Sequence, residues 1–136
     1  ALDKDGIAYK EYAIADTNEV KSVTTAAAGE CDVLYIPTDN TLASVTETVY
    51  NVVAPAKIPV IAGEEGICNG CGVATLSISY YDLGYATGEM AYEILAEGAD
   101  ITTMDVRYAP NVTKKYNAKI CEELGITVPD DYVAIQ

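Results

Sequence analysis

Short apolar runs alternate with longer amphipathic segments along this 136-residue chain, and this alternation limits the fold more than any other feature of the sequence. The apolar runs lie at 31–37, 58–62 and 73–78 and are bounded by turn residues, a pattern typical of strands buried on both faces of a parallel sheet. Parallel neighbours need a crossover, which is usually a helix. The pattern therefore predicts an α/β fold, a three-layer doubly wound parallel sheet covered by helices.

The segments between and after these runs complete the predicted order of elements. Helices are predicted where apolar residues recur at helical spacing, and loops where glycine clusters. We expect an extended segment at 7–15, helices at about 17–28, from Asp39 or Asn40 to about 56, and at 81–96, a glycine-rich loop at 63–72, a last strand at 104–108, a helix at 111–124 and a tail at 126–133. Residues 1–6 look like the last turn of a helix closed by a glycine, so we expect sequence upstream of them.

The composition narrows the range of functions. Eight basic and 21 acidic residues give a formal net charge of −13, which repels nucleic acids and anionic lipids. The chain has no histidine, so histidine-dependent catalytic triads are excluded. No GxGxxG or GxxxxGK[ST] motif follows a predicted strand, and we expect no nucleotide cofactor. No apolar run approaches the ~20 residues that a membrane-spanning helix needs. A binding module that catalyses no reaction fits these constraints.

Three clusters of polar and aromatic side chains follow the three predicted strands. Parallel strands place their carboxyl ends at one edge of the sheet, where helix N-termini offer unpaired N–H groups to a ligand. Carboxylates, amides, hydroxyls and phenol rings together suit a small ligand with a cationic amine and an apolar or aromatic body. We expect a ligand site at this edge, formed by Thr38, Asp39 and Asn40, then by Glu64 and Glu65, and then by Ser79, Tyr80 and Asp82.

A purely structural interpretation of the same residues stays open. Asp39, Asn40 and Asp82 are residue types that commonly cap helix N-termini. Glu64 and Glu65 lie in a glycine-flanked segment and on this view are simply solvated. The common placement of the three clusters favours a ligand site more than any one of the residues does.

Four cysteines allow several interpretations, of which the weakest are catalytic or metal-binding. Cys68 and Cys71 form a CxxC motif, but a redox CxxC needs a thiolate at a helix N-terminus, and this one leads into a predicted strand. A zinc ribbon would need a second CxxC. A disulfide between Cys68 and Cys71 fits an exported protein, whereas Cys31 and Cys121 are expected to be buried thiols.

Several segments taken together resemble one known family. They are DVLYIPTDNT at 32–41, KIPV at 57–60 followed by GEEG at 63–66, and SYYDLG at 79–84 followed by TGEM at 87–90. In this order and spacing, the chain resembles the ABC-transporter substrate-binding protein family, which includes tryptophan- and tyrosine-binding lipoproteins. The resemblance spans about residues 6–130 but covers only the second half or so of a family member. The CxxC and the glutamate at position 64, where aspartate is expected, depart from the family pattern.

The resemblance implies an architecture and a function. Members look like type I periplasmic binding proteins, in which two Rossmann-like lobes close over a ligand. On this basis residues 7–75 belong to the second lobe, the helix at 81–97 returns to a first lobe that is not present, and 104–136 form a closing strand, helix and tail. The implied cleft contacts are the eight residues named above. The implied ligand is an amino acid, with aromatic ones favoured.

The resemblance also implies partners and a location. The chain would deliver its ligand to an ABC permease on the outer side of the cell membrane or in the periplasm, as part of a lipoprotein and without a cofactor. A helix at 81–97 without its partner lobe would expose apolar surface, so we expect self-association. Two alternatives remain: a flavodoxin-like redox enzyme that uses Cys68 and Cys71, and the effector-sensing core of a transcription regulator, which would need an upstream helix-turn-helix.

Overall fold

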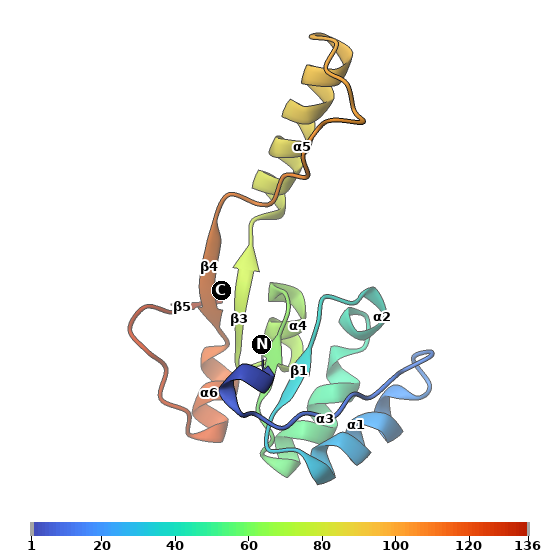
Figure 1. The fold of residues 1–136 in the computed structure, drawn as a ribbon. Coiled ribbons are helices and arrows are strands. Elements are labelled where there is room, and N and C mark those ends of the chain that lie inside the picture. Colours follow the sequence, from blue (N-terminus) through green and yellow to red (C-terminus); the bar gives the residue numbers. More distant parts are fainter. Residues whose placement is uncertain (1, 136) are drawn as a thin grey trace.

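The five strands of the protein form one sheet in the order β1-β2-β3-β4-β5 (Figure 1). The structure is a computed structural model and describes residues 2–135. Its elements along the chain are a 3-10 turn at Leu2–Asp5, α1 at Val20–Glu30, β1 at Leu34–Ile36, α2 at Asn40–Ala43, α3 at Thr46–Ala56, β2 at Val60–Ala62, α4 at Glu65–Cys71, β3 at Ala74–Ile78, α5 at Tyr80–Leu95, β4 at Val112–Tyr116, α6 at Ala118–Leu124 and β5 at Val133–Ala134.

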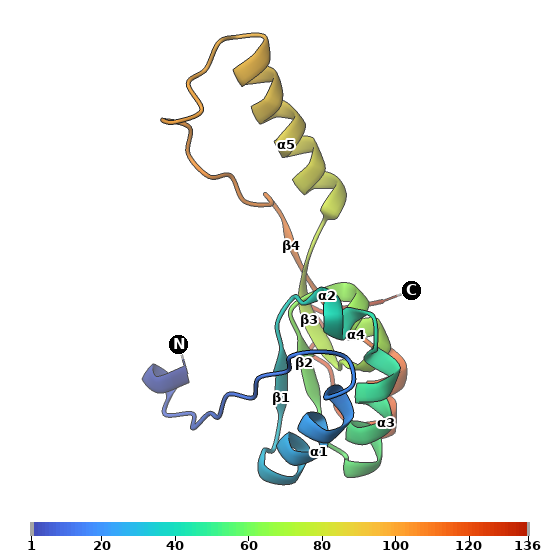
Figure 2. The same ribbon diagram turned by 90° about the vertical axis from the view of Figure 1, so that its right-hand side faces the viewer.

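The first three strands are parallel, which confirms the α/β class predicted from the alternation. β1 pairs with β2, and β2 with β3, all in the parallel sense. Figure 2 shows α1, α3 and α4 on one face of these strands, as right-handed crossovers between sequential strands require. Val60 and Ala62 point to that face and are buried, while Ile61 between them is exposed. The described residues thus form two layers, and they do not supply the second helical layer of the three-layer prediction.

The fourth strand departs from the all-parallel prediction. β4 pairs antiparallel with β3, from Ala74 opposite Tyr116 to Ile78 opposite Val112. The helix predicted over 111–124 is therefore wrong in its first half: only α6 is helical, and the side chain of Asn117 caps it by accepting from the N–H of Ile120. The strand predicted at 104–108 is also wrong, because those residues lie outside the sheet. The tail at 126–133 ends in β5, which pairs parallel with β4.

The glycine-rich segment at 63–72 is not a loop, which corrects a second prediction. It contains α4, whose buried side chains are Ile67, Cys68 and Cys71. These positions recur at helical spacing, and their burial against β2 and α3 stabilises a helix that Gly66 and Gly70 would otherwise disfavour. The helix predicted from position 39 or 40 to about 56 is likewise broken, because the backbone leaves the helical region at Val45 between α2 and α3.

The molecule divides into a packed part and a projecting part, here called the lobe and the arm. The lobe contains the sheet, α1 to α4 and α6, with a core centred on Val20, Val49, Val60 and Ile67. The arm is residues 80–111, which comprise α5 and the irregular segment after it. Figures 1 and 2 both show α5 extending away from the lobe, and no residue of α5 is buried. Along the chain, the arm is joined to the lobe by β3 at its start and by β4 at its end.

Candidate functional site

The carboxyl ends of β1 and β2 lie against each other and form the first part of the candidate site. The N–H of Gly63 donates to the carbonyl of Ile36 at 2.7 Å, and the hydroxyl of Thr38 donates to the carbonyl of Gly63 at 3.2 Å. A Cβ at position 63 would lie 2.6 Å from the backbone nitrogen of Thr38, so only glycine allows this approach. The first two polar clusters of the sequence are therefore neighbours at one edge of the sheet.

The cluster after β1 is exposed and is organised by a helix cap. Asp39 has an extended backbone, and its Oδ1 accepts from the N–H of Leu42 at 2.8 Å. The structural interpretation of Asp39 is thus correct for this oxygen, although the residue as a whole is exposed. Asn40 is the first residue of α2, and Thr38, Asp39 and Asn40 are all solvent-exposed.

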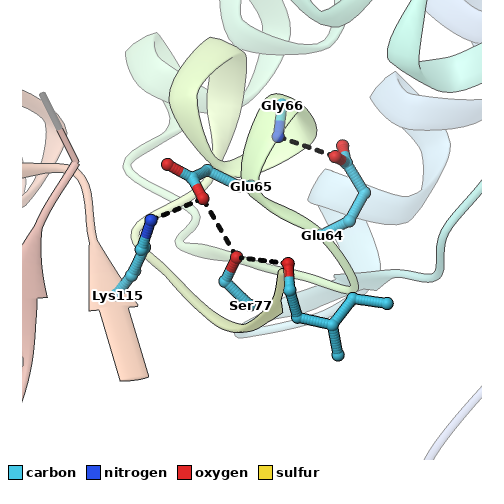
Figure 3. A network of polar contacts seen from close by, with 6 residues as sticks. Glu64, Glu65, Gly66, Ser77 and Lys115 are labelled. Carbon is cyan, nitrogen blue, oxygen red and sulfur yellow. Dashed lines mark hydrogen bonds and ion pairs between the residues drawn. The ribbon is translucent and has the colours of Figure 1, made fainter. Parts of the chain in front are cut away.

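The two glutamates after β2 have different partners (Figure 3). The carboxylate of Glu64 accepts from the N–H groups of Gly66, at 2.7 Å, and Ile67, and so caps α4. The carboxylate of Glu65 points the other way, toward β3 and β4. It accepts from the hydroxyl of Ser77 at 3.0 Å and pairs with the ammonium of Lys115 at 2.7 Å. Neither glutamate is merely solvated.

The third cluster lies where β3 passes into the arm. The hydroxyl of Ser79 accepts from the N–H of Asp82 at 3.1 Å and caps α5, so Asp82 is not itself the cap. The amide of Asn111 lies 3.4 Å from a carboxylate oxygen of Asp82 and links the two ends of the arm. Tyr80 leaves 59% of its surface exposed. β3 is parallel to β1 and β2 but continues to Ile78, three residues past the Thr75 that pairs with the last residue of β2, so this cluster lies on the same side of the sheet but beyond the edge that the other two clusters share.

The edge is acidic, and Lys115 is the cation in contact with it. The hydrogen bond from Lys115 is the main reason that the pKa of Glu65 lies below its ordinary value; burial opposes this effect, and the hydroxyl of Ser77 adds to it. A carboxylate held in this way stays ionised at neutral pH. Sequence reasoning missed Lys115 and Ser77. The register of β4 beside β3 brings Lys115 to Glu65, and the packing of α4 on β3 brings Ser77 there.

The CxxC cysteines are part of the core. Cys68 and Cys71 lie on α4, are fully buried and carry free thiols, so the predicted disulfide is not formed. Burial raises the pKa of each thiol to about 12, the opposite of what a reactive thiolate needs. Cys121 is also buried, as expected, and its thiol donates to the carbonyl of Val73, whereas Cys31 is only partly buried.

Two shallow hollows lie on the arm, one beside Asp100 and Arg107 and the other beside Tyr85 and Tyr92, and none of the eight predicted residues lines either. Within residues 2–135, three or more His, Cys, Asp or Glu side chains do not gather in a way that could hold a metal ion. No helix in that range is long and apolar enough to cross a membrane.

Comparison with known proteins gives consistent matches. The family model described as ABC transporter substrate binding protein matches residues 1–135. A curated relative, the tyrosine-binding protein of Clostridioides difficile (strain R20291), is 40% identical over 100 residues, which are 70% of this chain and 29% of the relative.

Three solved structures match nearly the whole chain. A ligand-free, open substrate-binding protein with adhesive properties from Clostridium difficile is 36% identical, with a TM-score of 0.73 over 99% of this chain and 47% of that chain. An ABC domain from Streptococcus pneumonia in complex with L-Trp is 33% identical, with a TM-score of 0.83 over 94% and 43%. A conserved domain protein from Vibrio cholerae is 30% identical, with a TM-score of 0.86 over 99% and 47%. The chain thus spans about half the length of these structures.

Proposed function

The chain belongs to the family of ABC transporter substrate-binding proteins, and from this premise we propose that it binds an amino acid, preferably an aromatic one, at the edge where β1, β2 and β3 end. Two relatives support the ligand class, one named for tyrosine binding and one solved with L-Trp. A free amino acid matches the ligand that the acidic and aromatic side chains of the edge suit, because it carries a cationic amine next to an apolar body.

One observation supports this proposal: β1 and β2 are parallel and end side by side, so that Thr38 and the two glutamates follow them at one edge, and β3 runs in the same direction toward Ser79. The hydrogen bond between Thr38 and Gly63 fixes two of the three strand ends relative to each other. A preformed edge of this kind lowers the entropic cost of binding, because the contacting groups do not have to be ordered by the ligand.

The proposed roles follow from which atoms are already engaged. The second carboxylate oxygen of Asp39 and the carboxylate of Asp82 hold the ligand amine, and Glu64 and Glu65 add negative potential while bonded within the chain. Thr38 and Asn40 offer hydrogen bonds to the ligand. Ser79 fixes the start of α5, where the exposed ring of Tyr80 packs against the aromatic body of the ligand.

The proposed setting is a two-lobed protein in which this chain is the carboxyl-terminal part. Residues 7–75 supply one side of the cleft, the helix at 81–97 packs on the other lobe, and 104–136 complete the chain. Ligand that contacts both sides favours the closed form, which docks on an ABC permease, and no bond is made or broken. The place of action is outside the cytoplasm, with the protein anchored as a lipoprotein.

Ligand-induced stabilisation tests the proposal. The thermal unfolding of the two-lobed protein that contains this chain is measured with each of the twenty amino acids, and a ligand present at about 100 times its dissociation constant adds roughly 2.7 kcal/mol. We expect L-Tyr or L-Trp to give the largest shift. Asp39→Asn should remove more than half of it. Asp32→Asn should leave it intact, because Asp32 is also exposed but precedes β1, at the opposite end of the strand.

Two outcomes contradict the proposal. If none of the twenty amino acids shifts the unfolding temperature, the ligand class is wrong. If Asp39→Asn and Asp32→Asn retain the same shift as the unchanged chain, the site lies elsewhere, and the Tyr80→Ser variant then tests the arm side of the edge separately.

A further inference from the structure

The carboxyl end of β3 extends beyond its neighbour β2. β2 pairs only with Ala74 and Thr75 of β3, whereas β4 pairs with all five residues from Ala74 to Ile78. Residues 76–78 with their partners 112–114 thus form a two-stranded ribbon outside the main sheet, here called the overhang. Isolated two-stranded ribbons are marginally stable and twist more than wider sheets do.

The overhang carries the arm. Ile78 leads through Ser79 into α5, and the chain returns from the arm at Val112 (Figure 2). The twist of the overhang therefore determines the direction in which α5 leaves the lobe. Something other than the sheet must fix that twist if the direction is to be defined.

Glu65 joins the overhang to the core of the lobe. It is the first residue of α4, and Ile67, Cys68 and Cys71 of that helix are buried in the core. One oxygen of its carboxylate contacts the hydroxyl of Ser77, which lies in the overhang, and the ammonium of Lys115, the β4 residue next to the overhang (Figure 3). Glu65 therefore bridges β3 and β4 where the overhang begins. The side chains of Lys115 and Glu65 are 27% and 37% exposed, against 48% and 58% for the neighbouring pair of Lys114 and Asp131. Because the Glu65–Lys115 pair is less exposed, screening by water weakens the attraction between its two charges less than it weakens that of the Lys114–Asp131 pair.

We propose that Glu65 is a positioning residue whose contacts with Ser77 and Lys115 fix the overhang against α4 and thereby set the direction of the arm. The other end of β4 has a separate attachment. The side-chain amide nitrogen (Nδ2) of Asn117 donates to the backbone carbonyls of Cys68, at 3.3 Å, and Asn69, at 2.9 Å. Loss of the Glu65 contacts therefore releases the overhang and leaves the base of β4 in place.

Backbone amide hydrogen exchange measured by NMR on the complete chain tests the first half of this proposal. Glu65→Gln and Lys115→Met should each speed exchange of the protected amides in 76–78 and 112–114 by roughly five-fold, and leave those of β2 unchanged. Asp131→Asn is the matched control, because it breaks the ion pair of the adjacent residue on the same strand without touching α4 or β3. Lys115→Arg, which keeps the charge, should restore slow exchange.

Residual dipolar couplings test the second half, because they report the orientation of α5 relative to α3. In the unchanged chain, the couplings of both helices should fit one alignment tensor. In Glu65→Gln, those of α5 should shrink while those of α3 keep their size. Any of four outcomes would overturn the proposal. The first three concern exchange: it is undisturbed in the overhang, accelerated equally by Asp131→Asn, or accelerated equally throughout the lobe. The fourth is that the α5 couplings stay unchanged in Glu65→Gln. Both experiments are done without ligand, so their result does not depend on whether the chain binds an amino acid.

Discussion

Helices α3 in the lobe and α5 in the arm are both amphipathic, but only one of them has a partner within the chain. The 11 residues of α3 bury Val49 and Val53 completely against α1, α4 and the sheet. The 16 residues of α5 bury none. Both helices show apolar residues at helical spacing, so the pattern alone does not reveal which helix is packed.

The difference leaves apolar and aromatic side chains of α5 exposed to solvent. One side of α5 is half-buried at Leu83, Ala86, Met90 and Ile94, whereas Tyr81, Tyr85, Tyr92 and Leu95 are exposed. Apolar and aromatic residues around most of a helix are typical of one that is enclosed on several sides. Substitutions at equivalent positions in the lobe and the arm should therefore have very different effects.

The largest contrast should come from truncating one apolar side chain in each part. Ile67→Ala in α4 should lower the free energy of unfolding by about 2–5 kcal/mol, since the side chain is completely buried and leaves a cavity. Leu95→Ala in α5 removes a side chain that is 85% exposed and should change it by less than about 0.5 kcal/mol. Urea unfolding followed by circular dichroism measures both. Equal losses would mean that the arm is packed in solution.

Glycine replacements should give effects of opposite sign in the two parts. A Cβ at Gly70 in α4 would lie 2.1 Å from the hydroxyl oxygen and 2.4 Å from Cβ of Thr46, so Gly70→Ala should destabilise the lobe by about 1–3 kcal/mol. A Cβ at Gly88 in α5 meets nothing within 4 Å. Gly88→Ala should therefore stabilise the arm helix locally by roughly 0.5–1 kcal/mol. Amide exchange in α5 detects that gain, and thermal unfolding detects the loss. A stabilising Gly70→Ala would contradict the packing of α4 on α3.

The sequence predicted the parts of the lobe whose signals are local. The strands at 34–36, 60–62 and 74–78 were expected because each is a short apolar run between turn residues. Helix α4 was missed because its glycines and its CxxC look like a turn, although Ile67, Cys68 and Cys71 have helical spacing. Glu64 also caps it, and glutamate is not a common capping residue.

The errors near the carboxyl end have a different cause. Residues 104–108 alternate apolar and polar side chains as a strand does and 112–116 do not, but the open edge of β3 pairs with 112–116. The site was predictable only in part, because some of its contacts join residues that are far apart in the sequence. Asp39 and Ser79 follow strands and could be found from the chain order, whereas Lys115 reaches Glu65 across 50 residues of sequence. Long-range pairing of this kind leaves no local signal.

The ion pair of Glu65 in the lobe should make the free energy of unfolding depend on pH, whereas the ion pair of the arm should not. Contact with Lys115 lowers the pKa of Glu65 in the folded state, so its stabilising contribution is present above the unfolded value of about 4.3 and is lost as the pH falls through the folded pKa. Glu65→Gln should therefore cost under about 1 kcal/mol at pH 7, given the partial exposure of the pair, and almost nothing at pH 3. Urea unfolding at the two pH values measures this. A cost that grows on acidification would contradict the assigned direction.

The matched variant in the arm is Glu93→Gln. It breaks the ion pair between Glu93 and Arg107, whose charged atoms lie 2.6 Å apart. The free energy of global unfolding should stay unchanged within error, because no residue of α5 is buried.

The smallest effect on folding, and the most informative about the arm, should come from its exposed aromatic side. Residues 80–111 carry six acidic side chains and one arginine, so two arms repel each other at low salt although their apolar surfaces would attract. We expect self-association of the chain to be weak at low ionic strength and to increase as salt screens the repulsion. The variant with Tyr92→Ser and Leu95→Ser should remove that increase and leave the free energy of unfolding unchanged, since both side chains are exposed. Light scattering at rising salt concentration measures the increase. A chain that stays monomeric at all salt concentrations would show that the tyrosine-rich surface of α5 is too polar to associate with its own copy, and that a partner with net positive charge suits this acidic arm better.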